Sequence, residues 1–325
     1  MALVAVRFHH SQFPDSVRHD LVESLRQRKL NHKFHYDSIK QSQKWLALHE
    51  QYSPARTDPD CIKIYDKSFQ FAGEKIGNKP VHLIGLGCGG GQKEEQLLRR
   101  LVEKGTKVHF TASDVSSALV LVAQQRAVAV IGTDNCDTLV CDLQTGDDLP
   151  LEFGEATLSG YQRIITFFGL IPNFEPQQIL PRLSAFLQPG DWLLLSANLS
   201  PGFDYHAGVE QVLPLYQNRM TEEWLMVILQ DLGVEQGDGE MEFLIEDRQH
   251  LKRITALFHF RKSRELHVHG ETIPFIAGDS IQLFFSYRHT PDTLRQVLGE
   301  VGIGVENEWI TSSGEEGVFL CRKRD

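Results

Sequence analysis

The chain lacks the features that identify membrane proteins and nucleic-acid-binding proteins. Its 325 residues contain no apolar run of about 18 residues, so we expect no membrane-spanning segment and no membrane partner. Lysine and arginine (33) are outnumbered by aspartate and glutamate (43), and they form no long cluster. Nucleic acid binding is therefore not expected, because neutralising phosphates requires a basic face. The apolar stretch at the amino terminus is too short for a signal peptide.

Cysteine is also scarce. The five cysteines are odd in number and lack the spacing of metal ligands or of a disulfide framework. We expect reduced thiols in a cytoplasmic protein, and no metal site. Hydrophobic residues make up 41% of the chain and charged residues 23%, which is ordinary for a globular protein with a substantial core.

Glycine is abundant in one segment, residues 81–95. A short apolar run (81–84) precedes five glycines within positions 85–91, and a polar helix-forming stretch follows. This order predicts a strand, a tight turn and a helix, in which backbone lies close to a nucleotide-like ligand. Gly85, Gly87 and Gly90 fit the G-x-G-x-x-G of dinucleotide sites, whereas Gly85, Gly87 and Gly89 fit the G-x-G-x-G of S-adenosylmethionine-dependent methyltransferases. A purely structural turn is the third interpretation.

Two aspartates follow the next predicted strands. Asp114 comes after the strand expected at 107–112, and Asp142 comes after the one expected at 138–141. A carboxylate at the end of the second strand suits the two hydroxyls of a ribose. Asp142 is a candidate to face an adenine edge. Both nicotinamide dinucleotides and S-adenosylmethionine carry a ribose, so Asp114 does not discriminate between them, and either aspartate could instead cap a helix or turn.

The remaining pattern predicts two kinds of sheet. Strands and helices alternate as far as residue 199, which is typical of a parallel sheet with crossover helices. These include a helix at 115–128, strands at 162–168 and 192–196, and a short helix at 181–186. Beyond residue 199 we expect helices within 205–232 and short antiparallel strands at 242–245, 253–259, 266–269 and 281–286. A helix from Thr290 and final strands at 305–310 and 318–322 complete the predicted pattern.

Several short motifs, taken in order, resemble those of a known family. They are Lys33-Phe-His-Tyr-Asp37, Tyr52-Ser-Pro-Ala-Arg-Thr57, the glycine turn, Asn173-Phe174, Gln188-Pro-Gly-Asp191, Tyr205 with Gly208-Val209, and Ser286-Tyr287-Arg288. This series is similar to the histidine-specific Nα-methyltransferases of ergothioneine biosynthesis, and it spans nearly the whole chain. The resemblance implies an α/β fold with a Rossmann-like class I methyltransferase sheet. It also implies a cofactor domain (61–199 plus 287–325) and an α+β substrate-binding domain (1–60 plus 200–286).

The resemblance also implies site residues. Asn173, Tyr36 and Tyr205 match catalytic positions near the amino-acid head group, and Tyr52 and Ser286 match substrate-binding positions. Gly85, Gly87, Gly89, Asp114 and Asp142 are expected to bind S-adenosylmethionine, with S-adenosylhomocysteine as product. Two positions differ from the family: Ser53 replaces a tyrosine, and Phe284 replaces the glutamate that pairs with an imidazole. We therefore count Phe284 as a substrate-binding residue and expect that histidine is not the substrate.

The predicted activity is methyl transfer to the nitrogen of a small amino-acid-like amine. No metal is needed, because the sulfonium donor carries its own activation. Two alternatives stay open at this point. One is a nicotinamide-dependent oxidoreductase, although we find no Tyr-x-x-x-Lys pair beyond the fourth strand. The other is a non-catalytic cofactor-binding homologue, suggested by Ser53 and Phe284. The acceptor, the number of methyl groups transferred and the oligomeric state are not predicted.

Overall fold

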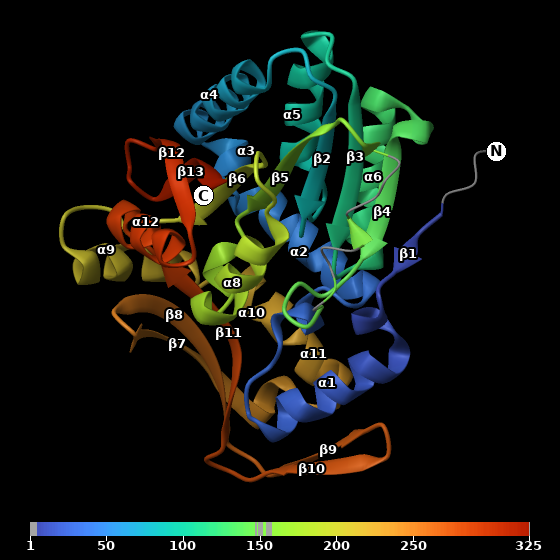
Figure 1. Cartoon of the computed structure of the whole chain (residues 1–325). Helices are drawn as coiled ribbons and strands as arrows, with labels where there is room; N and C mark the ends of the chain where they lie inside the picture. Colours follow the sequence, from blue (N-terminus) through green and yellow to red (C-terminus); the bar gives the residue numbers. More distant parts are fainter. Residues whose placement is uncertain (1–4, 147, 149–151, 154–157, 325) are drawn as a thin grey trace.

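The computed structural model describes residues 5–146, 148, 152–153 and 158–324, and its centre is an eight-stranded sheet (Figure 1). The strand order is β1-β4-β3-β2-β5-β6-β13-β12. Neighbouring strands are parallel except around β13, which is antiparallel to both β6 and β12. The strands are β1 (Arg7–Phe8), β2 (Val81–Leu86), β3 (Val108–Asp114), β4 (Cys136–Val140), β5 (Gln162–Phe168), β6 (Trp192–Asn198), β12 (Ile303–Ile310) and β13 (Glu316–Lys323). The predicted α/β fold is confirmed.

Helices cover both faces of this sheet. One face packs against α4 (Pro59–Ile76), α5 (Gln92–Glu103) and α6 (Ser117–Ile131), and the other packs against α8 (Pro176–Phe186) and α12 (Pro291–Glu300). Successive strand side chains point to opposite faces, so Leu83 of β2 packs towards α5 whereas Ile84 and Leu86 pack towards α8. This double coverage explains why all six residues of β2 are buried and why apolar runs identified the inner strands.

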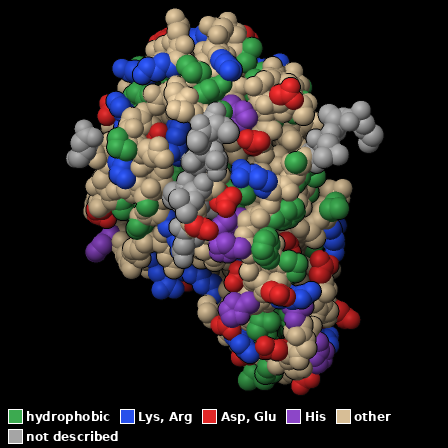
Figure 2. Space-filling view, turned by 45° about the vertical axis from the view of Figure 1, so that its right-hand side comes forward, with side chains coloured by type: hydrophobic (Ala, Val, Ile, Leu, Met, Phe, Trp, Pro, Cys, Tyr) green, Lys and Arg blue, Asp and Glu red, His purple; other side chains and the backbone are tan. Residues whose placement is uncertain are grey.

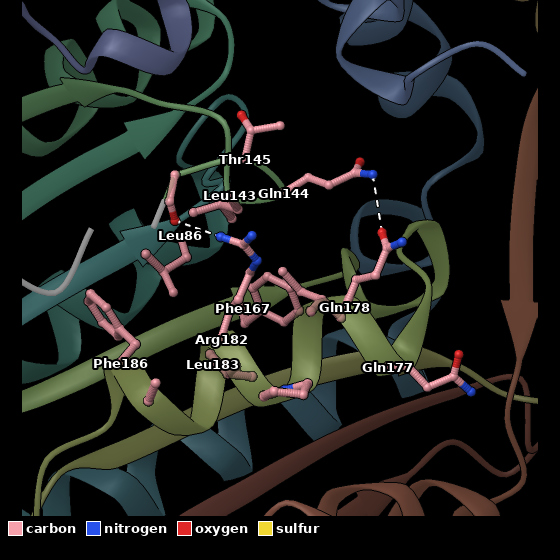
Figure 3. A pocket seen from close by; sticks show the side chains of 14 residues that line it. Leu86, Leu143, Gln144, Thr145, Phe167, Gln177, Gln178, Arg182, Leu183 and Phe186 are labelled. Carbon is pink, nitrogen blue, oxygen red and sulfur yellow. Dashed lines mark hydrogen bonds between the residues drawn. The ribbon is translucent and has the colours of Figure 1, made fainter. Parts of the chain in front are cut away.

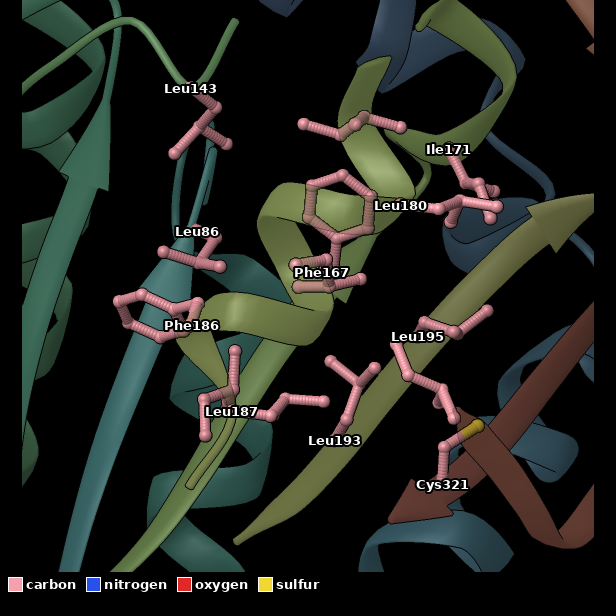
Figure 4. Packing of buried hydrophobic residues seen from close by; sticks show 14 of the residues in the cluster. Leu86, Leu143, Phe167, Ile171, Leu180, Phe186, Leu187, Leu193, Leu195 and Cys321 are labelled. Carbon is pink, nitrogen blue, oxygen red and sulfur yellow. The ribbon is translucent and has the colours of Figure 1, made fainter. Parts of the chain in front are cut away.

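The core beneath α8 is continuous across four strands. Figure 4 shows Leu86 of β2, Phe167 of β5, Leu193 and Leu195 of β6, and Cys321 of β13 packing in one cluster with α8 side chains. The thiol of Cys321 is fully buried there, and burial raises its pKa. All five cysteines are free thiols.

A second, three-stranded antiparallel sheet lies beside the large one. It consists of β11 (Ser280–Arg288), β8 (Leu251–Phe260) and β7 (Gly239–Arg248) in that order, and the hairpin of β9 (Arg264–Val268) and β10 (Glu271–Phe275) extends from it (Figure 1). Its core includes side chains from five helices: α1 (Pro14–Arg26), α2 (Ile39–Tyr52), α9 (Tyr205–Val212), α10 (Arg219–Leu225) and α11 (Val227–Asp231). Residues from the amino-terminal segment and from 200–286 therefore share one core, which is called the second core below.

Three elements differ from the sequence prediction. The helix expected from 181 begins at Pro176, and Pro181 lies inside it. Strand β10 was not predicted. It contains Pro274, and within the described residues it pairs only with β9, an edge position that tolerates proline. Arg7–Phe8, which the predicted division places in the substrate-binding domain, pairs instead with β4 at the edge of the large sheet.

The charged side chains on the face drawn in Figure 2 are interspersed, with acidic and basic groups side by side over both the main body and the smaller lobe below it. Among the described residues, no helix combines the length and the apolar character needed to cross a bilayer.

Candidate active site

The glycine turn lies at the carboxyl end of β2 and leads into α5. Gly87 (φ 58°) and Gly89 (φ 53°) adopt left-handed conformations that favour glycine. A β-carbon added at Gly87 would lie 2.2 Å from Leu170 Cδ1, and one added at Gly89 would lie 2.8 Å from Trp45 Cη2. The turn is therefore tightly packed between the segment after β5 and helix α2 of the amino-terminal segment. Gly85, by contrast, lies within β2, and a β-carbon added there would lie 3.1 Å from Cys88 Cβ and 3.2 Å from Phe110 Cε2.

Asp114 is the last residue of β3 and faces this turn. Its Oδ2 accepts the N–H of Gly89 at 2.9 Å, and its Oδ1 accepts the N–H of Ser116 at 3.0 Å. Burial raises the pKa of Asp114 to about 6, and the bonds from the backbone N–H groups of Ser116 and Gly89 oppose that rise. Each carboxylate oxygen keeps a second lone pair. Asp114 thus fixes the turn and retains acceptor capacity for hydroxyl groups.

Asp142 lies two residues beyond the end of β4 and is tied to the amino-terminal segment. Its Oδ1 accepts the N–H of Gln144 at 2.8 Å, and its Oδ2 lies 3.3 Å from Lys33 Nζ. The Lys33 ammonium, whose side chain is buried, also pairs with Asp20 of α1. Asp142 therefore has a turn-capping role and an ion-pairing role in this structure, and its proximity to an adenine edge stays a prediction.

Tyr36 lies at the end of a 3₁₀ turn (His32–His35) and near Asp114. Its ring packs edge-on to Trp45 at 5.7 Å and is tilted against Trp224 at 5.6 Å. Burial, and then the negative charge of Asp114, raise the pKa of the Tyr36 hydroxyl. Tyr36 therefore lies between the aromatic residues Trp45 and Trp224 and the carboxylate that holds the glycine turn.

Asn173 closes the 3₁₀ turn Ile171–Asn173 that follows β5. Its Nδ2 donates to the backbone oxygen of Phe285 at 2.9 Å, so this turn is attached to β11 of the three-stranded sheet. The amide oxygen of Asn173 forms no hydrogen bond with the described residues and can accept one from a ligand. The turn brings the predicted head-group residue to the junction between the two sheets.

Phe284 and Ser286 lie on β11 beside a β-bulge. The register shifts between Gln282 and Phe284, so Leu283 and Phe284 both pack into the second core. The Phe284 ring stacks on His32 at 5.0 Å, meets Trp224 edge-on at 5.9 Å and lies 6.2 Å from Tyr216.

Ser286 ends a short chain of hydrogen bonds. Its Oγ accepts the hydroxyl of Tyr216 at 2.9 Å, and that same hydroxyl accepts from Arg288 Nη2 at 2.9 Å. Ser286 and Phe284 are therefore both connected to Tyr216, a residue that the sequence did not single out.

Two predicted site residues, Tyr205 and Tyr52, lie in surroundings that the sequence did not indicate. The hydroxyl of Tyr205 donates to the backbone oxygen of Arg288 at 2.5 Å and accepts the N–H of Lys252 at 2.8 Å, so it joins β8 to β11. Tyr52 is the last residue of α2, its side chain is half-exposed, and it forms no side-chain hydrogen bond with the described residues. The adjoining Ser53 is buried.

Sequence reasoning missed several polar residues near the turn. Lys93, the second residue of α5, donates to the hydroxyl of Tyr65 at 2.7 Å, and Tyr65 donates to Glu316 Oε1 at 2.7 Å. Glu94 is buried beside them and accepts from Thr166 at 3.0 Å; burial raises its pKa to about 7. The acidic residue directly after the glycine turn was the one local signal for these residues. The contact between Tyr65 and Glu316 leaves no local signal, because the two residues are 251 positions apart in the chain.

Two cavities lie near these residues. The larger, about 700 Å³, lies on the α8 face and is lined by Leu86, Leu143, Phe167 and residues of α8; Figure 3 shows Gln144 bonded to Gln178 across it. It is separated from the glycine turn by β2, because the Leu86 side chain points away from α5. The smaller, about 230 Å³, includes Asn173, His32 and Phe285 in its wall, so it adjoins the predicted acceptor position.

Comparison with known proteins decides between the candidate cofactors. A family profile described as "histidine-specific methyltransferase, SAM-dependent" matches residues 17–323. The chain belongs to this family. The resemblance inferred from the sequence is confirmed, the cofactor of this methyltransferase is S-adenosylmethionine, and the nicotinamide alternative is set aside.

Relatives of this methyltransferase include N-methyltransferase imqF of Aspergillus flavus, which is 23% identical over 278 residues, or 82% of this chain and 73% of that protein. The family profile and this relative together support an S-adenosylmethionine-dependent N-methyltransferase as the enzyme class of this chain.

Among solved structures, an S-adenosylmethionine-dependent methyltransferase from Clostridium acetobutylicum has 13% identity, a TM-score of 0.46, and coverage of 87% of this chain and 99% of its own. The 1,6-didemethyltoxoflavin-N1-methyltransferase of Burkholderia thailandensis, solved with bound 1,6-didemethyltoxoflavin and S-adenosylhomocysteine, has 13% identity, a TM-score of 0.44, and coverage of 87% of each chain.

The residues around the glycine turn of this methyltransferase fit the cofactor. The carboxylate of Asp114 has acceptor capacity for the ribose hydroxyls, and the left-handed glycines leave the backbone without β-carbons above β2. When bound, the cofactor supplies an electrophilic methyl group on a sulfonium.

Proposed function

We propose that the methyl acceptor is an amino-acid-like amine with an apolar or aromatic side chain, and that histidine is not the substrate. The observation that carries this proposal is the surroundings of Phe284. Its ring lies among His32, Trp224 and Tyr216, where the family places a carboxylate for an imidazole. An aromatic wall suits a flat or apolar side chain by burial and ring contact.

A histidine acceptor would lose a partner at this position. A buried imidazole needs hydrogen bonds at both ring nitrogens, and each unsatisfied polar group costs about 1–3 kcal/mol. Phe284 offers no acceptor. His32, which stacks on Phe284, uses Nε2 to accept the N–H of Phe285 at 3.2 Å. Its buried Nδ1 has no partner among the described residues and can donate to one imidazole nitrogen, but it supplies no acceptor for the N–H of the other. Phe284 therefore disfavours a histidine side chain, whereas an apolar side chain needs no hydrogen-bond partner at this position.

The proposed roles of the other residues follow from their hydrogen-bonding groups. Asn173, whose amide oxygen is available, orients the acceptor's amine or ammonium. Tyr36, packed beneath Trp45 and near Asp114, shapes the space between acceptor and cofactor. Rate enhancement then comes mainly from attack geometry, which can supply about 7–11 kcal/mol, and from loss of the amine proton before transfer.

The test compares acceptors directly. The protein is incubated with S-adenosylmethionine and, separately, histidine, phenylalanine, tryptophan and tyrosine, and methylated products are measured by mass spectrometry. Calorimetry on protein saturated with S-adenosylhomocysteine measures acceptor affinity. We expect an aromatic acceptor to bind and to be methylated, with weak affinity for histidine. Histidine binding below millimolar concentration, with turnover, would overturn the proposal.

A pair of variants localises the effect. Phe284→Ala should weaken binding of the aromatic acceptor, because it removes one wall of the site. Phe13→Ala serves as the matched control, since Phe13 is half-exposed ahead of α1. Equal affinities in the two variants would show that Phe284 does not contact the acceptor.

A further inference from the structure

Two histidines near the start of the chain and one aspartate beyond β4 bring three potential metal ligands together. His9 Nε2 lies 2.7 Å from Asp148 Oδ1, and His10 Nε2 lies 3.3 Å from the same oxygen. All three ligand atoms lie within 4.8 Å of one another. Among the residues that the structure describes, no other group of three histidine, cysteine or acidic side chains converges within that limit.

The spacing of these atoms suits a metal ion. A tetrahedral ion with bonds of about 2.0–2.1 Å to nitrogen and oxygen keeps its ligand atoms about 3.3 Å apart. His10 Nε2 is already at this distance from Asp148 Oδ1, and His9 Nε2 is closer. A small outward adjustment of the Asp148 carboxylate therefore makes room for an ion between the three side chains.

The ring of His9 is held in place through its other nitrogen. The His9 side chain is 1% exposed, and its Nδ1 lies 2.8 Å from Ser11 Oγ. Ser11 Oγ accepts the N–H of Asp142 at 3.0 Å and keeps a second lone pair. Nδ1 also accepts the N–H of Ser11 at 3.2 Å, which is compatible with a ring proton on Nε2. When an ion binds Nε2, this proton moves to Nδ1, where Ser11 Oγ accepts it, as such outer partners of metal-binding histidines commonly do.

The large sheet fixes the segments that carry the three ligands. Strand β1 pairs with β4, and the N–H of His9 donates to the backbone oxygen of Val140 at 2.9 Å. Asp148 follows a turn in which the N–H of Gly146 donates to the backbone oxygen of Asp142 at 2.9 Å. The histidines are 138 and 139 positions from Asp148. This separation leaves no spacing motif in the sequence, which is why no metal site was expected.

The chemistry of the ligands indicates the class of ion. Two imidazole nitrogens and one carboxylate suit zinc, cobalt, nickel or copper, whereas calcium and magnesium prefer sites built from oxygen atoms. The side chains of His10 and Asp148 are 59% and 44% exposed. An ion can therefore enter from solvent and keep a water molecule as its fourth ligand, while the buried His9 supplies a fixed one.

We propose that His9, His10 and Asp148 bind one divalent transition-metal ion of the zinc class, which fastens the amino-terminal segment to the segment after β4. The role of this ion is structural, because it holds the part of the chain that carries Asp142. The proposal is independent of the acceptor proposed above.

The test uses the whole, untagged chain after treatment with EDTA and dialysis, and Zn²⁺ is the probe. Calorimetry measures its affinity and stoichiometry, and the absorption spectrum with Co²⁺ reports the type of ligand. His10→Ala and Asp148→Asn each remove one ligand from an exposed side chain, so both variants should fold. His19→Ala is the matched control, because His19 is an exposed histidine of α1 outside the cluster.

We expect one Zn²⁺ per chain, with affinity weakened about tenfold or more in His10→Ala and in Asp148→Asn, since loss of even an outer partner of a ligand costs about 10–100-fold. His19→Ala should bind Zn²⁺ as the unmodified chain does. Zn²⁺ should also raise the thermal unfolding midpoint of these two proteins more than that of the ligand variants. Absence of saturable binding, or equal affinities in all four proteins, would overturn the proposal. A Co²⁺ spectrum with thiolate charge-transfer absorption would also overturn it, by assigning the ion to cysteine.

Discussion

The six-membered ring of Trp45 lies directly against the α-carbon of Gly89, so that a β-carbon there would lie 2.8 Å from Trp45 Cη2. This contact joins helix α2 of the amino-terminal segment to the glycine turn. The N–H of Gly89 is in turn bonded to Asp114 at 2.9 Å. One glycine therefore connects the aromatic residues of the second core with the carboxylate proposed for the ribose.

Substitution of Gly89 should disturb both connections. Gly89→Ala places a side chain on a residue with φ 53° and pushes against Trp45, so we expect the free energy of unfolding to fall by about 1–3 kcal/mol and S-adenosylhomocysteine to bind more weakly. Gly105→Ala is the control, since Gly105 has φ 78° with nothing within 4 Å of the added carbon. Equal losses in urea unfolding would show that Trp45 contributes nothing.

Cofactor affinity should depend on the protonation of Asp114. Burial raises its pKa to about 6, well above the ordinary value, so the carboxylate becomes protonated as the pH falls through 6. A protonated carboxyl accepts ribose hydroxyls less well, and affinity for S-adenosylhomocysteine should decrease on the acid side of this value.

Variants distinguish Asp114 from its titrating neighbours. Glu94, Tyr36 and Cys88 interact electrostatically with Asp114, and burial raises the pKa of Glu94 to about 7. Asp114→Asn should remove the change in affinity near pH 6, whereas Glu94→Gln should retain it. Loss of the change in Glu94→Gln alone would assign the pH dependence to Glu94. Calorimetric titrations across this pH range make the comparison.

A buried arginine should dominate the stability of the junction between the sheets. The Arg253 side chain is 2% exposed and pairs with Glu175 at 3.0 Å and Glu246 at 2.7 Å. Arg253→Met leaves both carboxylates without this cation, and we expect a loss of about 3–5 kcal/mol in urea unfolding. Arg219→Met removes an exposed ion pair with Glu223 and should leave stability unchanged. Similar midpoints for the two variants would contradict this account.

The sequence identified features that depend on neighbouring residues. Apolar runs located β2, β5 and β6, because strands buried on both faces are largely apolar, and the Ser113-Asp114 pair marked the end of β3. The Gly89–Asp114 relationship was also foreseeable, since both residues lie at the carboxyl ends of adjacent parallel strands. Helix α8 was placed too late, because Pro181 was taken as its start although Pro176 occupies that position.

Features built by distant residues were not foreseeable. The row from Lys93 to Glu316 depends on β13 inserting beside β6, which brings together residues 251 positions apart. The aromatic wall at Phe284 depends on a β-bulge and on a histidine near the amino terminus, neither of which leaves a local signal. The bridging role of Tyr205 between β8 and β11 has the same origin.

Calorimetric titration of S-adenosylhomocysteine into the unmodified protein and into Asp114→Asn at neutral pH tests the cofactor site most directly. The account predicts saturable binding to a single site in the unmodified protein and a marked loss of affinity in the variant. Absence of heat with the unmodified protein, or equal affinity in both, would contradict the assignment of the glycine turn and Asp114 as the cofactor site.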